Sequence, residues 1–322
     1  MLLIDSKTVL ESPAADLSHA AKVVEKLFEA RREGSAASAQ EVPMRPRAIE
    51  SAFYSLPALI ESEGIAGIKW TTHARAGNPY TKPLVILNDL RDGTPLALID
   101  GWVISAVRTA AVSLAFYRHL EGLEKNAVLL CGAGHQAEWQ GLALFERFAD
   151  LGRLYIWSRK PEHAEDCRRR ILVRLEASGR TADIRIVNNF RDALEDVDFV
   201  VGATSADEPY LQKKDLAGCG YVHIGMNDAS REALLSYPSI ICDEFESAKL
   251  KSAQSLFRLW RRDNSVEERI VLLEEYEGVI PIGERFCFDA FGLSIFDLGL
   301  AAEAYRYALA CGKGVNWPVF GR

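Results

Sequence analysis

The chain has 322 residues, of which 48% are hydrophobic and 26% are charged, proportions typical of a globular protein of about two domains. Its formal net charge of −7 and pI near 5.5 argue against a nucleic-acid-binding surface. No run of about 18 apolar residues predicts a membrane span, and the N-terminus lacks the pattern of a signal peptide. The six cysteines are scattered without a CxxC pair, so we expect a cytoplasmic protein with neither a metal site nor disulfides.

The first hundred residues predict a strand, a helix and then a β-rich region. Residues 2–4 are apolar and predict a short opening strand, and residues 16–32 place apolar side chains at helical spacing. The small polar residues of segment 34–40 predict a connector. Between residues 52 and 100, strand-forming residues alternate with Gly, Pro, Asn and Asp, and DLRDGTP at 89–95 predicts a hairpin turn.

The clearest motif follows an alanine-rich segment, 104–120, that predicts a helix. An apolar run at 127–131 leads into GAGHQA, and the residues after it have helical spacing. Strand, glycine turn and helix are the context that a dinucleotide fingerprint requires. Gly132 would permit the tight turn, Gly134 the approach of a pyrophosphate, and Ala137 the close packing of helix on strand. We therefore predict a site for a nicotinamide or flavin dinucleotide at the start of this helix.

After the glycine turn, strands and helices alternate regularly. Strands are predicted at 153–158, 183–187, 198–204, 221–225 and 240–243, and helices at 161–177, 191–194 and 293–310. This alternation predicts an α/β protein with a Rossmann-type, doubly wound parallel sheet and right-handed crossovers. We expect this domain, residues 119–294, to be inserted into a smaller α+β domain, residues 1–118, that a C-terminal helix, residues 295–322, completes. The basic run at 168–170 is interpreted as a solvated helix face.

The end of the second strand of the doubly wound sheet bears on the choice of cofactor. An NAD enzyme usually has an acidic residue there, bonded to the ribose 2′-hydroxyl. This chain has Trp157, Ser158, Arg159 and Lys160 instead. Because an acid would repel a 2′-phosphate whereas these side chains could bind one, we favour NADP(H) over NAD(H).

Seven segments, in this order, resemble the ornithine cyclodeaminase/mu-crystallin family: GIKW, LVILND, SAVRTAAVS, GAGHQA, GATSADEPYL, GMNDASRE and FGLSIFDLGLAA. The resemblance covers nearly the whole chain. GIKWTTHARAGN and LVILND are most similar to the branch around the N-(2-amino-2-carboxyethyl)-glutamate dehydrogenase of diaminopropionate biosynthesis. The resemblance implies a homodimer whose first domain binds substrate and dimerises, with the substrate facing a nicotinamide. It also implies hydride transfer at the nitrogen-bearing carbon of an amino, imino or N-substituted amino acid.

Two basic side chains are the main candidates for binding the substrate. Lys69 has apolar neighbours in a predicted strand, where a lysine is costly unless it has a partner. The resemblance places it beside the reacting amine or imine, as a catalytic residue. Arg108 would hold the α-carboxylate through two parallel hydrogen bonds. Arg45 matches a second carboxylate-binding arginine of the family, and Arg47 is the alternative at that place.

Two further positions are candidates for acid–base or orienting roles. Asp228 follows the fifth predicted strand of the doubly wound sheet, where such folds bind ligands, and a carboxylate there could act as a general base. One branch of the family places its acid one residue earlier, at Asn227, which would then bind substrate rather than move protons. Asp297 also matches a carboxylate of the family, with either a helix N-terminal or substrate-orienting role or a structural one. His73 and His135 each stand alone, and we assign neither a catalytic role.

The glycine fingerprint, the strand end at 158–160 and the resemblance together predict a set of cofactor-binding residues. They are Thr109, Gly132, Gly134, His135, Gln136, Ala137, Ser158, Arg159, Lys160, Ala203, Thr204, Ser205, Gly225 and Met226. At 158–160 the chain departs from the branch that it resembles, which is similar to NAD users with an acid there. Three functions follow from the whole pattern. The first is an oxidoreductase that reduces an imine, or oxidises a C–N carbon before imine hydrolysis. The alternatives are a cyclodeaminase that recycles bound NAD(H) and releases ammonia, and a protein that binds NADPH and a small ligand without catalysis.

Overall fold

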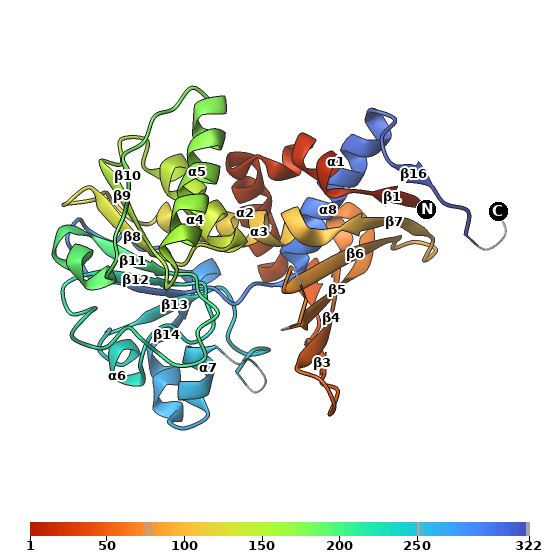
Figure 1. Ribbon diagram of the computed structural model, residues 1–322. Coiled ribbons are helices and arrows are strands. Elements are labelled where there is room, and N and C mark those ends of the chain that lie inside the picture. Colours follow the sequence, from red (N-terminus) through yellow and green to blue (C-terminus); the bar gives the residue numbers. More distant parts are fainter. Residues whose placement is uncertain (75, 78, 250–251, 253, 320–322) are drawn as a thin grey trace. The chain divides into compact units, whose positions relative to one another are not determined.

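The computed structural model describes residues 1–74, 76–77, 79–249, 252 and 254–319, and the chain forms two compact units (Figure 1). The first unit comprises Met1–Ala111 and Gly292–Arg322, and the second comprises Val112–Phe291. The sequence places the corresponding boundaries after residue 118 and before residue 295. Each unit has its own eight-stranded sheet.

The sheet of the first unit is largely antiparallel. Its strands are β1 (Leu2–Ile4), β2 (Ala36–Ser38), β3 (Val42–Met44), β4 (Ser51–Ile60), β5 (Ile65–Ala74), β6 (Thr81–Asp89), β7 (Pro95–Asp100) and β16 (Val315–Asn316). They are ordered β16-β1-β7-β6-β5-β4-β2, with β3 also paired to β4. The predicted β-rich region and its hairpin are confirmed. The prediction of a connector at 34–40 was wrong in part, because β2 pairs antiparallel with β4 there.

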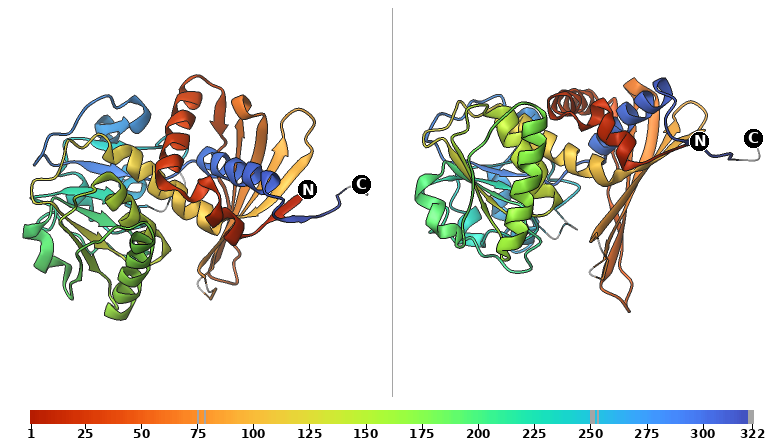
Figure 2. Two further views of the ribbon diagram at one scale, coloured as in Figure 1. Left: turned by 90° about the horizontal axis from the view of Figure 1, so that it is seen from above. Right: turned by 45° about the horizontal axis from the view of Figure 1, so that its top comes forward.

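Helices cover one face of this sheet (Figure 2). The helices of this unit are α1 (Ser6–Glu11), α2 (Leu17–Arg32), the start of α3 (Gly101–Tyr117), and α8 (Ser294–Ala310). The predicted amphipathic helix is confirmed as α2, which begins where the Asp16 side chain accepts a hydrogen bond from the His19 amide. Within the C-terminal segment 295–322 the helix ends at Ala310, and a glycine-containing turn leads into β16, which pairs with β1.

The second unit has the doubly wound parallel sheet that the sequence predicts. Its strands are β8 (Ala127–Cys131), β9 (Arg153–Trp157), β10 (Ile184–Ile186), β11 (Phe199–Gly202), β12 (Gly220–His223), β13 (Ile240–Cys242), β14 (Ile270–Leu272) and β15 (Cys287–Asp289). Their order is β10-β9-β8-β11-β12-β15-β13-β14. The sequence missed β14 and β15. Because β15 inserts between β12 and β13, the fifth and sixth predicted strands are not neighbours.

Both faces of the parallel sheet are buried, as the apolar strand sequences require. The helices of this unit are the end of α3, α4 (His135–Arg147), α5 (Pro161–Ala177), α6 (Arg231–Leu234) and α7 (Ser255–Trp260). The short predicted helix at 191–194 is a 3-10 helix, Phe190–Asp196. On one face Phe116 of α3 stacks on Phe288 of β15, with ring centroids 4.3 Å apart. Cys131 and Cys242 are fully buried in the core on the other face.

Two properties of the described residues bear on how the chain is used. No helix among them is both long and apolar enough to cross a bilayer. Within the same residues, no group of three or more His, Cys, Asp or Glu side chains is arranged to hold a metal ion.

Candidate functional site

Lys69, Arg108 and Asp297, which lie far apart in the sequence, meet in the first unit. Lys69 is in the middle of β5 and is 4% exposed. Its Nζ donates to Asp297 Oδ1 at 2.7 Å and to Ser105 Oγ at 2.9 Å. Arg108 Nε lies 3.4 Å from the second oxygen of Asp297. A strand and two helices therefore supply the cluster, with Asp297 in the first turn of α8, where the helix dipole also favours a carboxylate.

This cluster has one more positive group than negative groups. Burial, together with the nearby Arg108 charge, lowers the pKa of Lys69 to about 8, even though Asp297 favours the protonated form. The side chain of Arg108 is 13% exposed, and its Nε makes no hydrogen bond within the described part of the chain. Two buried cations that share one carboxylate can accept a second anion, and an α-carboxylate has the matching charge and shape.

The position of the Arg108 side chain depends on a glycine, whose lack of a Cβ leaves room for the guanidinium. Gly292 has φ +90°, and a methyl group added there would lie 1.6 Å from Arg108 Nη1. Any larger residue would therefore displace the guanidinium as well as strain the backbone. Thr109, a predicted cofactor-binding residue, is buried beside Arg108 in α3 and donates its hydroxyl to the Ser105 carbonyl.

The structure does not bring Arg45 or Arg47 into this cluster. Both arginines are exposed, in and near the chain that follows β3. Arg45 contacts Tyr54, whose hydroxyl lies 3.4 Å from Nη2 and whose ring lies under the guanidinium. Carboxylate binding by either arginine stays a prediction.

The glycine turn of the second unit has the geometry that the fingerprint predicts. Gly132 has φ +132°, and a methyl group there would lie 2.4 Å from the Ala203 carbonyl oxygen, so only glycine fits this turn. Gly134 precedes the first residue of α4, and the space beside its Cα is open. Ala137 is fully buried, which lets α4 pack close to β8. The turn leaves the amino end of a 13-residue helix available to phosphate.

An ion cluster that the sequence did not predict braces this turn. Glu138, in the first turn of α4, is 4% exposed and accepts hydrogen bonds from Arg170 and Arg174 of α5, each at 2.8 Å. Arg170 also donates to the carbonyl of Ala133, inside the turn, at 3.1 Å. The solvated-face interpretation holds for Arg168 and Arg169, which are paired within α5. For Arg170 it was wrong, because the buried Glu138 attracts this side chain inward.

The other predicted cofactor residues follow the carboxyl ends of neighbouring parallel strands, which share one edge of the sheet. Ser158 is half-buried after β9, whereas Arg159 and Lys160 are exposed. After β11 and β12, Ser205 and Met226 are also exposed. The remaining members of the set after these strands are Ala203, Thr204 and Gly225, and after β8 they are His135 and Gln136. This common edge supports the set, which stays a prediction.

Asp228 and Asn227 are both buried, and each makes hydrogen bonds to residues of other loops. Asp228 is fully buried, and Thr204 donates to it through its hydroxyl and, at 3.4 Å, through its amide. Burial raises the pKa of Asp228 despite these donors. Asn227 donates to the Asp207 carbonyl at 2.5 Å and accepts from the Ser255 hydroxyl at 3.0 Å. Their assigned catalytic and substrate-binding roles therefore stay predictions, and the contacts seen are structural.

His223, which the sequence analysis did not single out, joins Asp228 to a second buried acid. Its Nδ1 lies 2.6 Å from Asp289 Oδ2, its Nε2 lies 4.0 Å from Asp228 Oδ2, and all three side chains are fully buried. Burial alone would lower the pKa of His223, but Asp289 and Asp228 outweigh it and the pKa is raised. The available signal was position, since His223 and Asp289 are the last residues of β12 and β15, but His223 fell inside the predicted strand 221–225 and no strand was predicted at β15.

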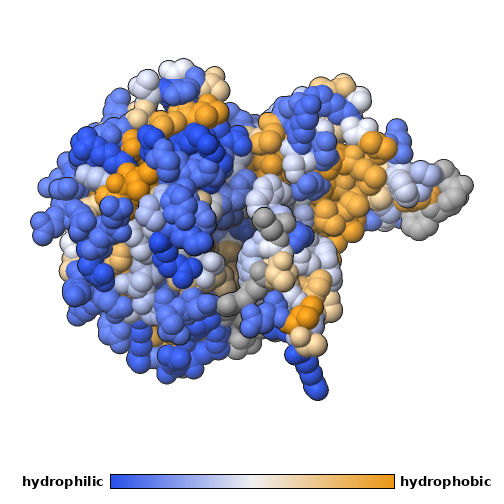
Figure 3. Space-filling view, in the orientation of Figure 1, coloured by the Kyte–Doolittle hydropathy of each residue, from blue (hydrophilic) through white to orange (hydrophobic). Residues whose placement is uncertain are grey.

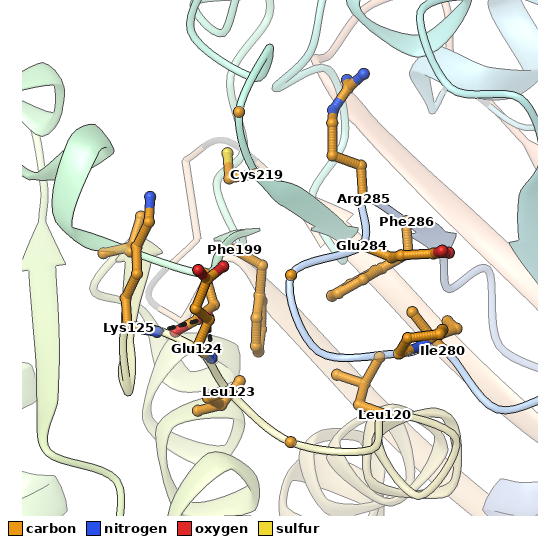
Figure 4. Close-up of a pocket in the computed structure, with 16 residues that line it drawn as sticks. Leu120, Leu123, Glu124, Lys125, Phe199, Cys219, Ile280, Glu284, Arg285 and Phe286 are labelled. Carbon is orange, nitrogen blue, oxygen red and sulfur yellow. Dashed lines mark hydrogen bonds between the residues drawn. The ribbon is translucent and has the colours of Figure 1, made fainter.

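The small pocket of the second unit shown in Figure 4 is not the dinucleotide site. It encloses about 30 Å³, and Lys125, Phe199 and Cys219 are among the residues that line it. These residues lie at or just before the amino ends of β8, β11 and β12, the edge opposite the glycine turn. Asp198 closes the loop beside it by accepting the amides of Glu124 and Lys125 at 2.6 and 3.0 Å.

Comparison with known sequences identifies relatives of the chain. A sequence profile of the ornithine cyclodeaminase/mu-crystallin family matches residues 6–233. The Δ1-pyrroline-2-carboxylate reductase of Bacillus thuringiensis subsp. konkukian is 23% identical over 277 residues, which cover 80% of this chain and 82% of the relative. The N-((2S)-2-amino-2-carboxyethyl)-L-glutamate dehydrogenase of Staphylococcus aureus is 24% identical over 199 residues, 59% of this chain and 58% of the relative. The second relative supports the resemblance to its branch.

Two solved structures share the fold. The Δ1-pyrroline-2-carboxylate reductase of Thermococcus litoralis, in complex with NADH and L-proline, has a TM-score of 0.88 and 22% identity, with 98% of this chain and 100% of that chain covered. An archaeal alanine dehydrogenase dimer with bound NAD has a TM-score of 0.82 and 23% identity, with 99% of each chain covered. At these identities the likeness shows the fold, and the predicted Rossmann-type class is confirmed.

Proposed function

The chain belongs to the ornithine cyclodeaminase/mu-crystallin family, and we propose that it is an NAD(P)-dependent oxidoreductase acting at the C–N bond of an amino, imino or N-carboxyalkyl amino acid. One observation carries the proposal: Lys69 and Arg108 are buried together on a single carboxylate, Asp297. A structural ion pair would balance its charges, whereas this cluster retains capacity for an anion. The relatives matched over about four fifths of their length are Δ1-pyrroline-2-carboxylate reductases, and the substrate in that name bears such a carboxylate.

In the proposed reaction the cluster binds the substrate and manages a proton. Arg108 and Lys69 hold the α-carboxylate, and Asp297 keeps both side chains in place. Because the pKa of Lys69 is about 8, its ammonium can give a proton to a developing amine near neutral pH. Bound nicotinamide would supply or accept the hydride at the carbon that bears nitrogen.

The glycine turn and the residues after β9 support a dinucleotide in the second unit, and we propose NADP(H) rather than NAD(H). Ser158, Arg159 and Lys160 offer one hydroxyl and two cations, with no acid at that strand end. The two exposed cations are free to fold over a 2′-phosphate.

We also propose that the protein works as a homodimer in the cytoplasm. The face of the first unit's sheet opposite Lys69 presents the half-buried Ile68, Ile86 and Leu98 and the 41%-exposed Leu84. Figure 3 shows hydrophobic residues gathered over the part of this unit that contains β6 and β7. A second copy is the occupant that an alanine dehydrogenase dimer of the same fold supports. Leu84→Glu should therefore lower the mass measured by light scattering. The cytoplasmic assignment rests on six free cysteines, five of them buried.

One assay tests the function and separates its alternatives. Purified protein is mixed with NADPH or NADH and a panel of cyclic imines, 2-oxo acid plus amine pairs, and ornithine, while nicotinamide absorbance and ammonia are followed. We expect net oxidation of NADPH with at least one imine. Ammonia from ornithine without net NADH turnover would establish the cyclodeaminase instead. Tight NADPH binding without any turnover would establish a binding protein.

A further inference from the structure

Strand β5 extends the substrate cluster into a strip of side chains on one face of the sheet. Alternate residues of a strand point to the same face, so Thr71 and His73 follow Lys69 at steps of about 6.6–6.8 Å. The burial pattern agrees, because Lys69 and Thr71 are buried whereas Trp70 and Thr72 are only half-buried. A substrate whose carboxylate lies at Lys69 can therefore place its side chain along Thr71 toward His73.

Thr71 has a polar atom without a partner. The residue is 5% exposed, and its Oγ1 makes no hydrogen bond to any described residue. A buried hydroxyl left unpaired is costly, because it has lost its hydrogen bonds to water without gaining a replacement. Its neighbours across the sheet are Tyr54 on β4 and Pro83 on β6, and proline has no amide hydrogen to offer. The hydroxyl is thus available to a bound molecule.

His73 closes the strip with an uncharged, aromatic wall. Its ring centroid lies 5.0 Å from that of Tyr54 and 5.5 Å from that of Tyr80. Burial, with a contribution from the Lys69 charge, lowers the pKa of His73 to about 4, so the ring is neutral at physiological pH. The influence of Lys69 on His73 also agrees with their lying on one face.

The register of the sheet shows that the strip contains no acid. The residues opposite Lys69, Thr71 and His73 are Leu56, Tyr54 and Ala52 on β4, and Val85, Pro83 and Thr81 on β6. Of the acids near the strip, Asp297 is already engaged by Lys69 and Arg108, and the charge of Glu41, which acts on Tyr54, is opposed there by that of Arg45. A side chain with a terminal ammonium would find no counter-charge among these residues.

We propose that Thr71 and His73 form the side-chain subsite of the substrate pocket, and that it takes an uncharged side chain or the ring of a cyclic imine. The inference rests on the proposed function, because it assumes a substrate carboxylate at Lys69. Thr71 bonds a polar atom of the substrate near the reacting carbon. His73, with Tyr54, packs against the far end of the side chain and excludes a terminal ammonium.

Three amino acids of matched length test the subsite: norvaline, ornithine and glutamate, oxidised with NADP⁺ and compared by kcat/KM. We expect norvaline to exceed both charged analogues by at least about tenfold, the effect of one unpaired polar group in a pocket. His73→Asp should raise the ratio of ornithine to norvaline by about tenfold, because it supplies the missing counter-charge. Equal or better turnover of either charged analogue by the unchanged protein would overturn the proposal.

Thr71 has a matched control in the next residue. Thr71→Val removes the hydroxyl from the strip, and Thr72→Val makes the same change on the opposite face of β5. Thr71→Val should raise KM several-fold with kcat largely kept, and Thr72→Val should leave both near their original values. Identical behaviour of the two variants, in a protein that turns over imines or amino acids, would sink the subsite alone. No turnover of any substrate would instead sink the proposed function.

Discussion

Each unit of the protein contains a buried cluster of charged side chains, and the two clusters are built with opposite charge balance. In the first unit, two cations, Lys69 and Arg108, share the single acid Asp297. In the second unit, two acids, Asp228 and Asp289, flank the single histidine His223. Each cluster is built from elements distant in sequence. The first has an excess of positive charge, which can bind an anion.

The difference in charge balance supports the proposal that the first cluster, around Lys69, binds the substrate. An excess of buried positive charge is relieved by an anion from outside, such as a carboxylate. An excess of buried negative charge can be relieved internally, by protonation, and the raised pKa values of Asp228 and His223 point that way. The sequence assigned an acid–base role to Asp228, and that role stays a prediction. The excess positive charge that an anion could neutralise lies in the cluster around Lys69.

The largest effect is expected when the positive excess is removed. Lys69→Met should lower kcat/KM by about 10²–10⁴-fold, the range for loss of a positioned proton donor. In the unchanged protein, kcat/KM should fall above about pH 8, where Lys69 loses its proton. Lys22→Met, an exposed change on α2, is the control. A pH profile that is flat through pH 9 would contradict the assigned role of Lys69.

Removing the acid of the first cluster should instead damage stability. Asp297→Ala leaves Lys69 and Arg108 buried without their shared partner, which typically costs about 3–5 kcal/mol in the free energy of unfolding. Glu303→Ala in the same helix breaks a partly exposed pair with Arg306, and should cost less than about 1 kcal/mol. Urea denaturation of both variants measures the contrast. Similar losses in the two variants would show that the buried cluster contributes no more to stability than the partly exposed ion pair.

The second cluster predicts a pH dependence of stability. A raised folded pKa gives His223 a stabilising effect that is complete below its unfolded value of about 6.5 and is lost as pH rises through the folded pKa. The raised pKa of Asp228 acts in the same direction from its unfolded value upward. Asp289→Asn removes the acid bonded to His223, so it should cost about 1–3 kcal/mol at pH 6 and flatten this dependence.

Hydrogen exchange can localise that effect to the second unit. Protection of amides in β11 and β12 should decrease from pH 6 to pH 8.5 in the unchanged protein, after correction for intrinsic exchange. The decrease should be smaller in Asp289→Asn, and β5 in the first unit serves as the internal reference. If protection of β12 rises with pH, the assigned charge state of His223 is wrong.

How well the sequence predicts each feature depends on how far apart in the sequence its contacting residues lie. The glycine turn was predictable because strand, turn and helix are contiguous, and Gly132 is needed for a backbone reason. Lys69 and Asp297 were proposed separately from a family resemblance, but their contact joins residues 228 positions apart and no spacing rule gives it. Arg170 and His223 were missed because their partners, Glu138 and Asp289, lie on other elements.

Smaller effects are expected on dinucleotide affinity, because Arg170 would act on it only by holding the glycine turn in position. Arg170→Met would free the Ala133 carbonyl and leave Glu138 with Arg174 and the more distant His135. Affinity for NADPH and NADH should fall by a similar factor, about tenfold, because the pyrophosphate is common to both. Fluorescence titration measures the two dissociation constants. Unchanged affinities with lowered thermal stability would mean that Arg170 only supports the fold.

Arg159→Ala removes a charge and leaves the glycine turn unchanged. It should therefore discriminate most between NADPH and NADH. Arg159 is exposed after β9, so its removal disturbs no buried contact. If it binds the 2′-phosphate, affinity for NADPH should fall about 10-fold or more, the value of a hydrogen bond to a charged group, while affinity for NADH stays nearly constant. Equal changes for the two dinucleotides would show that the strand end does not read the 2′-phosphate. Paired with Arg170→Met, the variant separates recognition of the 2′-phosphate from support of the pyrophosphate turn.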